Sequence, residues 1–482
     1  MKLSQVLAGV ELRELHGDPN LEVRGVSYDS RTTQPGDLFV AVTGYAADGH
    51  RFIPMALEKG ACAVLCEHAP QADVPCAVVE SARAALARVG ANWYGHPAEH
   101  MTVIGVTGTN GKTTVTYLLK SILEQCLGAK VGLIGTIQNM VGEEVLETEH
   151  TTPESFELQG LLARMREAGC SHVVMEVSSH ALALHRVDYI PFEAGIFTNL
   201  TEDHLDFHKT MEAYRRAKAI LFTRCRRGII NLDDSAAQQM ISDAGCPVLT
   251  YSARGRAADL QAEQIALEAD RVSFLAKAGE AQQEIRLGIP GGFTVYNALA
   301  AIGAATALGM QLPEIAAALS GARGVKGRVE VVPTPGKEYT VLIDYAHTPD
   351  GLENVLRAVQ GFCRGRVIAV FGCGGDRDPM KRPIMGRIGV EYSDLAVITS
   401  DNPRTEDPNE IIRQITAGFA GTEKPYVVIE NRREAIRWAM DHAQKDDIIV
   451  LAGKGHETYQ ILGTVKTHLD EREEVAAYLA GD

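Results

Sequence analysis

The chain has no C-x-x-C pair among its nine cysteines, and no apolar run approaches eighteen residues. The first absence argues against a zinc site or a disulfide framework and favours reduced thiols. The second argues against a membrane-spanning helix, and the N-terminal segment also lacks the apolar core of a secretion signal. We therefore expect a cytoplasmic protein without membrane insertion.

An excess of positive charge is also missing. The formal net charge is −15, which argues against a general binder of nucleic acid or of anionic membranes. It does not exclude a small anionic substrate, because glycine loops and arginines act locally. No G-x-S-x-G motif supplies a serine hydrolase signature. What is present is an ordinary globular composition in 482 residues, a length that predicts two to four domains.

The segment VIGVTGTNGKTTVTYLLK, residues 103–120, ends like a phosphate-binding loop but does not begin like one. The common pattern is G-x-x-x-x-G-K-[ST], and Val106 stands where its first glycine belongs. The glycines are Gly105, Gly108 and Gly111, a different spacing around the same lysine. This spacing indicates a nucleotide-binding family distinct from the common NTPases.

The physical elements of a phosphate site are nevertheless present. Residues 102–107 form a β-branched apolar run that predicts a buried parallel strand, and residues 113–126 show helical spacing. A glycine-rich turn between them points backbone N–H groups and the positive end of the helix dipole at one spot. We expect Lys112 to contact the outer phosphates and the Thr113 hydroxyl to bind Mg²⁺.

The fold class predicted is α/β, with three domains. A small α/β unit spans residues 1–97, and a central P-loop domain with a parallel sheet spans 98–331. In the central domain strands are expected to alternate with helices up to about residue 330. The segment VVPTPGKEYT is interpreted as a linker, and a Rossmann-like α/β domain follows over residues 332–482.

Polar residues follow four predicted strands of the C-terminal domain. They are Asp344, Gly372 to Arg377, Asp401 to Arg404, and Gly453 to Glu457. Open parallel sheets bind ligands at the carboxyl ends of their strands. The pattern therefore predicts a second ligand site, separate from the phosphate loop.

Two loops of the central domain carry candidate metal ligands. Glu176 ends a predicted strand, and His204 follows the next one in the segment NLTEDHLDFH. Together with Thr113 they could hold Mg²⁺ beside a triphosphate. Because Mg²⁺ prefers oxygen, His204 could equally be a loop histidine bonded to a carbonyl group. We expect His180, His185 and His208 to be structural.

Four motifs together, GTNGKTT, EVSSHALALHR, NLTEDHLDFH and DNPR, resemble those of the Mur ligases of bacterial cell-wall synthesis. The resemblance covers essentially the full length. It is strongest to members that add meso-2,6-diaminopimelate to UDP-N-acetylmuramoyl-L-alanyl-D-glutamate. It implies a uridine-nucleotide domain, a central ATP-binding domain and a C-terminal amino-acid domain. ATP would phosphorylate the terminal carboxylate, the amine would attack the acyl phosphate, and ADP and phosphate would be released. The implied cofactor is Mg²⁺, ATP is a co-substrate, and a monomer is expected.

The resemblance also implies a role for individual residues. The catalytic set is Lys112, Glu176, His204 and Lys218, and the metal ligands are Thr113, Glu176, His204 and a carbamylated Lys218. ATP contacts are Gly108, Thr109, Asn110, Gly111, Lys112, Thr113, Thr114, Asn297, Arg328, Asp344 and His347. Contacts to the UDP-substrate are Tyr28, Ser30, Tyr45, Ala46, Ala47, Thr151, Thr152, Ser178, Leu184 and Arg186; some relatives have glutamine at the position of Leu184. Contacts to diaminopimelate are Arg377, Asp401, Asn402, Pro403, Arg404, Gly453 and Glu457.

Diaminopimelate has a carboxylate and an ammonium at its far end, whereas lysine has only the ammonium. Arg404 and Arg377 suit the carboxylate, and Glu457 suits the ammonium. A simpler interpretation is that Arg404 pairs with Glu406 or Asp407 on its own loop. The rival functions are a lysine-adding relative, a folylpolyglutamate synthetase, and a P-loop regulatory or scaffold protein without chemistry.

Overall fold

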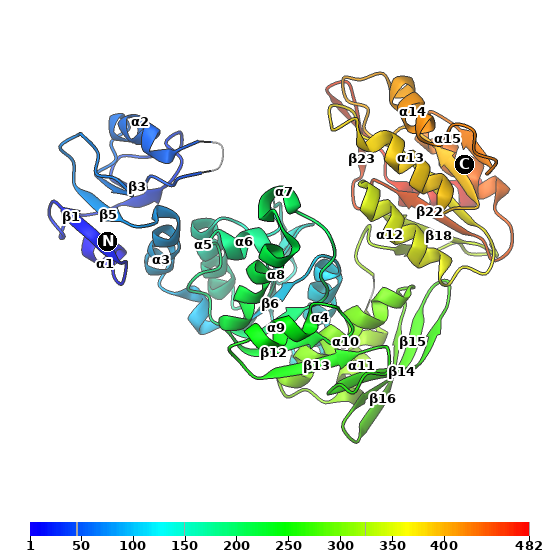
Figure 1. The fold of residues 1–482 in the computed structure, drawn as a ribbon, viewed down its shortest axis with the longest axis horizontal. Helices are drawn as coiled ribbons and strands as arrows, with labels where there is room; N and C mark the ends of the chain where they lie inside the picture. The colour runs from blue at the N-terminus through cyan, green and yellow to red at the C-terminus, as the bar shows by residue number, and fades with distance from the viewer. Residues whose placement is uncertain (45–46, 149, 323, 482) are drawn as a thin grey trace. The chain divides into compact units, whose positions relative to one another are not determined.

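The computed structural model describes residues 1–44, 47–148, 150–322 and 324–481. Its contacts divide the chain into two compact units. The first is Met1–Thr250 with Gly303–Leu308, and the second is Tyr251–Ile302 with Gly309–Asp482. The domain boundaries at residues 97 and 331 remain predictions. Figure 1 shows the elements of both units.

The N-terminal part of the first unit is a five-stranded sheet in the order β1-β5-β4-β3-β2, parallel except for β1. Alternate residues of its strands face two separate cores. Leu38 and Leu65 pack with α1 and α3, whereas Phe39 and Val64 pack with α2. The bounds are α1 Leu3–Val6, β1 Leu12–His16, β2 Gly25–Ser27, β3 Asp37–Val40, α2 Ile53–Glu58, β4 Ala63–Cys66, β5 Cys76–Val79 and α3 Ala82–Trp93.

The rest of the first unit is built on strands in the order β12-β11-β6-β10-β7-β8-β9. The predicted strand over residues 102–107 is confirmed as β6, which runs parallel to both of its neighbours. The carboxyl ends of β6, β10 and β11 therefore share one edge of the sheet. The bounds are β6 Thr102–Thr107, α4 Lys112–Leu127, β7 Val131–Ile134, β8 Asn139–Val141, β9 Glu144–Leu146, α5 Ser155–Glu167, β10 His172–Glu176, α6 Ser179–Ala183, β11 Phe192–Phe197, α7 Leu205–His208, α8 Met211–Ala219, β12 Cys225–Asn231 and α9 Ala237–Asp243.

The second unit begins with an antiparallel meander instead of the expected strand–helix alternation. Strands β14, β15 and β16 follow one another directly, and β14 pairs in parallel with the end of β13. Turns at Gly279 and at residues 268–271 join them, so no crossover helix is required. The bounds are β13 Val248–Ser252, β14 Leu260–Leu267, β15 Val272–Ala278, β16 Ala281–Leu287, α10 Gly292–Ala307 and α11 Leu312–Ser320.

The C-terminal sheet has the order β17-β18-β22-β19-β20-β21 and is parallel from β18 to β21. The segment interpreted as a linker is wrong in part, because Glu330–Val332 pairs antiparallel with β18 and the prolines lie in the connecting hairpin. The bounds are β17 Glu330–Val332, β18 Thr340–Asp344, α12 Pro349–Gln360, β19 Val367–Phe371, α13 Lys381–Glu391, β20 Leu395–Ile398, α14 Pro408–Thr416, β21 Tyr426–Val428, α15 Arg432–His442, β22 Ile448–Ala452, β23 Tyr459–Leu462, β24 Val465–His468 and α16 Glu471–Ala480.

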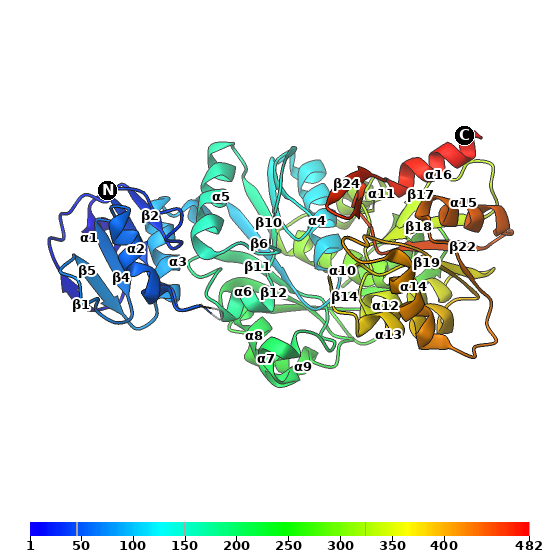
Figure 2. The same cartoon turned by 90° about the horizontal axis from the view of Figure 1, so that it is seen from above.

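Both faces of this sheet are covered, as Figure 2 shows. Leu342 and Phe371 pack with helices α12, α13 and α14, whereas Val341 and Val370 pack with α15 and α16. Burial on both faces explains why its strands are continuous apolar runs. Among the described residues, no helix has the length and apolarity needed to cross a membrane.

The first residues of α15 and α16 form a fully buried ion pair. The Arg432 guanidinium donates to Glu471 Oε1 at 2.9 Å and to the Ala452 carbonyl oxygen at 2.9 Å, and both charged side chains are 0% exposed. Replacing Arg432 with methionine would leave the Glu471 carboxylate buried without its partner. We expect a loss of about 3–5 kcal/mol in the free energy of unfolding, measured by urea denaturation.

The double variant Arg432→Met/Glu471→Leu is expected to recover most of that loss, because it buries no charge. The exposed pair Arg413–Glu410 on α14 is the control, and Glu410→Gln should leave the urea midpoint unchanged. A double variant as unstable as Arg432→Met would show that packing, and not charge, dominates at this position.

Candidate active site

The phosphate loop lies between β6 and α4, and its backbone leaves no room for a side chain at Gly108. Gly108 has φ 147°, and a Cβ there would lie 1.9 Å from Thr198 Oγ1. The Lys112 ammonium donates to the carbonyl oxygens of Gly108 at 2.9 Å and Thr109 at 2.8 Å. The lysine therefore folds back over the loop, where a phosphate group would lie.

Residues after β11 hold this loop in place. Asn199 accepts a bond from the Asn110 N–H at 2.9 Å through its side chain, and one from the Thr109 N–H at 2.9 Å through its carbonyl oxygen. The Thr198 hydroxyl donates to the Asn110 carbonyl oxygen at 2.6 Å. No role was predicted for Thr198. Its position directly after a parallel strand is the sequence feature that could have indicated one.

Glu176 is buried at the carboxyl end of β10, next to the first turn of α4. Its Oε1 accepts from the Thr113 hydroxyl at 2.9 Å and from the Thr136 N–H at 3.0 Å. The Thr136 hydroxyl donates to Oε2 at 2.9 Å. Thr113 and Glu176, chosen from separate motifs, are therefore in direct contact, and Thr136 was missed because it lies outside any motif.

Lys218, on α8, is almost completely buried. Its Nζ lies 4.3 Å from the centre of the Tyr214 ring, and the Tyr214 hydroxyl is 3.2 Å from Thr109 Oγ1. Burial, followed by the positive charge of Lys112, holds the pKa of Lys218 well below its usual range, while Asp203 acts in the opposite direction. Its ammonium group therefore loses a proton more readily than that of an exposed lysine.

His204 is placed less tightly. Its side chain is about half exposed, and its Nε2 lies 3.4 Å from Asp203 Oδ2. Its backbone has a left-handed φ of 52°. Its ring lies 4.9 Å from that of His180 and 6.1 Å from that of Tyr214. Within the described residues no three His, Cys, Asp or Glu side chains converge as a ready metal site. Whether His204 is a ligand stays a prediction.

His208 lies behind this cluster and hydrogen-bonds to Ser179 Oγ at 2.9 Å. Burial, followed by the charges of His180 and Lys218, lowers the pKa of His208 to about 4. The unfolded chain then binds more protons than the folded one between pH 6.5 and 4, so stability falls as the pH falls through that window. In His208→Gln the urea midpoint should depend less on pH over this range. An identical slope in wild type and variant would contradict the assignment.

The residues expected to contact the muramoyl-peptide lie together at the same edge of the sheet. Thr152 Oγ1 donates to the Glu176 carbonyl oxygen at 2.8 Å and accepts from the Ser178 N–H at 3.2 Å. Arg186 donates to the Thr152 carbonyl oxygen at 3.0 Å and pairs with Glu154. Thr151 lies 3.0 Å from Thr136 Oγ1. The arrangement offers the Arg186 cation to an anionic group.

Two of the uridine-pocket candidates, Tyr28 and Ser30, lie directly after strand β2 of the N-terminal sheet. Ser30 is buried, and its hydroxyl contacts Met55 Sδ at 3.3 Å. Burial and a hydrogen bond to Glu157 of α5 raise the pKa of the Tyr28 phenol. Tyr45 and Ala46 lie outside the described residues, and Ala47 follows them.

In the second unit, Asp344 is buried at the end of β18. Its carboxylate accepts from the N–H groups of Val329 and Ala346, both at 2.8 Å. The Arg328 guanidinium lies 5.6 Å from the Tyr345 ring centre, and its buried Nε has no hydrogen-bond partner in the described part of the chain. His347 bonds to the Tyr345 carbonyl oxygen, and Asn297 is buried on α10.

The predicted strand-end clusters of the C-terminal sheet do meet at one edge, because β18, β22, β19 and β20 are parallel neighbours. Arg404, with φ 52°, donates to the Gly375 carbonyl oxygen at 2.8 Å. Glu406 instead binds the buried Arg382 through two bonds of 2.8 Å, and Asp407 caps α14. The simpler interpretation, that Arg404 pairs with either acid, is therefore wrong.

Asp401, Asn402 and Glu457 lie together beneath Gly453. Gly453 has φ 117°, and a Cβ there would lie 2.6 Å from Asp401 Oδ2. Asn402 Nδ2 donates to Glu457 Oε2 at 3.0 Å. Lys454 belongs to the predicted cluster Gly453 to Glu457, without a predicted role of its own, and it is buried at the centre of these side chains. Arg377 follows Gly375 on the neighbouring loop, and Pro403 leads into Arg404.

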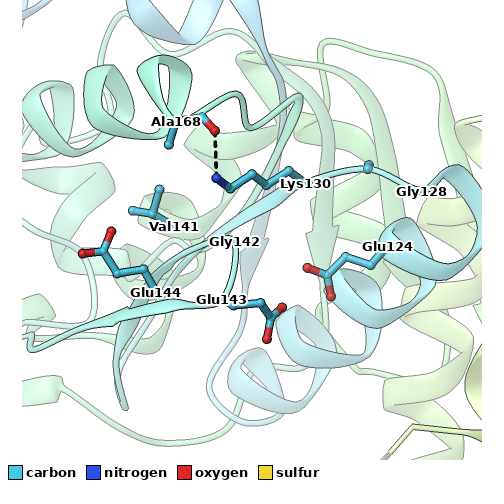
Figure 3. A pocket seen from close by; sticks show the side chains of 9 residues that line it. Glu124, Gly128, Lys130, Val141, Gly142, Glu143, Glu144 and Ala168 are labelled. Atoms are coloured by element: carbon cyan, nitrogen blue, oxygen red, sulfur yellow. Dashed lines mark hydrogen bonds between the residues drawn. The ribbon is translucent and has the colours of Figure 1, made fainter.

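A hollow of about 670 Å³ lies elsewhere on the central sheet (Figure 3). Its walls include Lys130, which precedes β7, and the turn at Glu143, so it lies at the amino ends of the strands, opposite the phosphate loop. Lys130 donates to the Ala168 carbonyl oxygen at 2.8 Å, as Figure 3 shows. Glu124 pairs with Lys120, and Glu144 pairs with Arg164. It is therefore separate from the candidate active site.

Three family profiles match the chain in sequence order. Residues 22–100 match "Mur ligase family, catalytic domain", residues 106–305 match "Mur ligase middle domain", and residues 327–455 match "Mur ligase, glutamate ligase domain". The chain belongs to the Mur ligase family. It is therefore an ATP-dependent ligase with the three-domain α/β architecture that the sequence predicted, and both predictions are confirmed.

Similar proteins include two curated Mur ligases, each named UDP-N-acetylmuramoyl-L-alanyl-D-glutamate–2,6-diaminopimelate ligase. That of Caldanaerobacter subterraneus subsp. tengcongensis is 50% identical, with 100% of this chain and 99% of the relative covered. One from Clostridium acetobutylicum, numbered ligase 1, is 48% identical with 99% of each covered. A solved structure of a ligase with the same name has a TM-score of 0.76 at 32% identity and covers 100% of this chain and 99% of its own.

Proposed function

We propose that this Mur ligase adds meso-2,6-diaminopimelate to UDP-N-acetylmuramoyl-L-alanyl-D-glutamate, with ATP converted to ADP and phosphate. Its relatives at 50% and 48% identity over the full length carry that name. The observation that carries the proposal is that one edge of the C-terminal sheet has both a positive and a negative side chain for the two charged groups of one substrate. Arg404 is available near Gly375 for a carboxylate, and Glu457 lies beside Asn402 for an ammonium. A lysine-adding ligase would have no use for Arg404.

The chemistry follows from the substrates. A carboxylate is inert to amines at neutral pH, and transfer of the γ-phosphoryl group turns one of its oxygens into part of a leaving group. The amine of diaminopimelate then attacks the acyl carbon, and phosphate leaves from the tetrahedral intermediate. Lys112 would offset the repulsion between the carboxylate and the γ-phosphate. Backbone N–H groups at the start of α4 would hold the phosphates, because those of Thr109 and Asn110 already bond to Asn199.

We propose Mg²⁺ as the metal, with Thr113, Glu176, His204 and Lys218 as the residues that would hold it. The donor set fits, because the Thr113 hydroxyl and the Glu176 carboxylate are in contact and supply hard oxygen atoms. Carbamylation of Lys218, which the lowered pKa of its buried amine favours, would add a further carboxylate-like ligand. When bound, the metal ion would neutralise phosphate charge.

The remaining substrate contacts are proposed from the residues as they lie. The buried and unpartnered Nε of Arg328 is a donor suited to ATP, and Asn297, Asp344 and His347 would make further contacts to ATP. The muramoyl-peptide would contact Thr151, Thr152, Ser178, Leu184 and Arg186, and the uridine would contact Tyr28, Ser30 and the loop that ends at Ala47. A monomer in the cytoplasm completes the proposal.

An assay of phosphate release tests this function. The purified chain is incubated with Mg²⁺, ATP and UDP-N-acetylmuramoyl-L-alanyl-D-glutamate, and with meso-diaminopimelate, L-lysine or no amino acid. We expect release with diaminopimelate alone. Turnover with lysine and not with diaminopimelate would establish the lysine-adding alternative, and no release with either would overturn the ligase proposal.

A further inference from the structure

Lys454 lies among the polar residues at the carboxyl ends of β20 and β22, and none of the proposed substrate contacts involves it. Its side chain is 0% exposed. Its Nζ lies 3.1 Å from Asn402 Oδ1, 3.3 Å from Glu457 Oε2 and 3.5 Å from Asp401 Oδ1. A lysine is rarely buried unless its charge is paired, so this position is specifically built.

We propose that Lys454 is a positioning residue for the amino-acid substrate: its ammonium group lies between Asp401 and Glu457 and fixes the carboxylate that receives the ammonium group of the substrate. This inference rests on the proposed function and identifies a determinant of its amino-acid site.

The hydrogen bonds around Glu457 support this role. Lys454 and Asn402 both donate to Oε2 of Glu457, at 3.3 and 3.0 Å. In the described part of the chain no hydrogen bond reaches the other oxygen, Oε1. One oxygen is thus fixed by the protein, and the second is left as the acceptor for an incoming ammonium.

The charges of the cluster lead to the same conclusion. Asp401 and Glu457 contribute two negative charges and Lys454 one positive charge, so one negative charge remains for the substrate cation. Burial acts to raise the pKa of Asp401, but the charges of Lys454 and Arg432 outweigh it and hold that pKa below its usual range. Without Lys454, burial would act on Asp401 without this opposing charge, and the pKa of Asp401 would rise.

Other ionisable groups around the cluster have defined partners. Arg432 acts on Asp401 and Glu457 but is itself paired with Glu471. The Tyr459 ring centre lies 5.8 Å from the ammonium of Lys454. His347, from the loop after β18, helps to lower the pKa of Asp401, and the Glu457 charge helps to raise the pKa of Tyr345 in the same loop. None of these groups supplies a second ammonium to the two carboxylates.

The test measures the KM for meso-diaminopimelate by phosphate release, for Lys454→Met and for wild type, between pH 6 and 9. At pH 7 we expect an increase of roughly tenfold or more, from the loss of a charge-assisted hydrogen bond, with KM for ATP within about twofold of wild type. The ratio of variant to wild-type KM should fall as the pH rises, because Asp401, with its pKa raised in the variant, then loses its proton. A ratio independent of pH would mean that Lys454 only fills space, and would overturn the proposal.

Two further variants make the test specific. Lys454→Arg keeps the charge, so the ratio of its KM to the wild-type KM should be independent of pH. A ratio that falls as the pH rises would overturn the proposal. This arm of the test also holds if Lys454→Met cannot be recovered folded. Lys466→Met, an exposed lysine near the same Tyr459 ring, should leave KM unchanged. Failure of wild type to use diaminopimelate would instead reject the proposed function itself, which the wild-type assay alone reveals.

Discussion

Replacing Lys112 with alanine is expected to lower kcat by about 10²–10³, because a positioned cation over the phosphates is lost where charge shifts during phosphoryl transfer. In the structure the ammonium is held over the loop by the carbonyl oxygens of Gly108 and Thr109. ADP binding should weaken much less than kcat falls, since the backbone N–H groups of the loop remain. The measurements are steady-state phosphate release and titration calorimetry with ADP.

Lys130→Ala is the matched control for Lys112→Ala. Lys130 belongs to the same unit but lies at the opposite edge of the sheet, where its ammonium group donates to the Ala168 carbonyl oxygen. Its kcat should stay within about twofold of wild type. A Lys112→Ala enzyme with nearly normal kcat would show that the loop lysine is structural, and the proposed ATP site would then have to be abandoned.

Replacing Arg404 with alanine is expected to raise KM for meso-diaminopimelate roughly 30- to 150-fold, the equivalent of about 2–3 kcal/mol for a lost charge-assisted contact. KM for ATP should change little, because Arg404 lies at the ends of the C-terminal strands and contacts the loop at Gly375. Arg404→Lys keeps the charge but not the planar fork, and should be intermediate.

Activity with L-lysine distinguishes a role of Arg404 in substrate recognition from a role in the stability of its loop. Lysine lacks the far carboxylate, so Arg404→Ala should lose its preference for diaminopimelate without losing any weak activity toward lysine. Arg413→Ala on the exposed face of α14 is the control and should have no effect. If both substrates and ATP are affected equally, Arg404 is a loop-stabilising residue, and the specificity assigned to it is wrong.

Much of the fold could be predicted because its strands are buried and parallel. Residues 102–107 are continuous, β-branched and followed by glycines, and they form β6 as expected. The prediction failed where strands meet without a crossover helix. The meander of β14 to β16 and the hairpin from Glu330 have no long helical pattern between them, and their pairing partners are set by the sheet as a whole.

The candidate site was found only as far as motifs extend. Glu176, Thr113 and Arg404 stand in recognisable segments, whereas Thr136 and Thr198 are ordinary threonines whose roles follow from their neighbours in space. Lys454 is a further example, because a lysine in a glycine-rich segment gives no sign of complete burial.

The sequence by itself determined the family, the order of the strands and helices around the phosphate loop, and the residue types available for phosphate, carboxylate and ammonium groups. These depend on local spacing and on side-chain chemistry. Only the tertiary structure decided which polar groups satisfy one another: that Glu406 belongs to Arg382 and leaves Arg404 to its loop, and that Lys454 stands between two acids. Such pairings join residues distant in sequence, and burial makes each unpaired charge costly, so they are fixed by the packed chain and not by any segment of it.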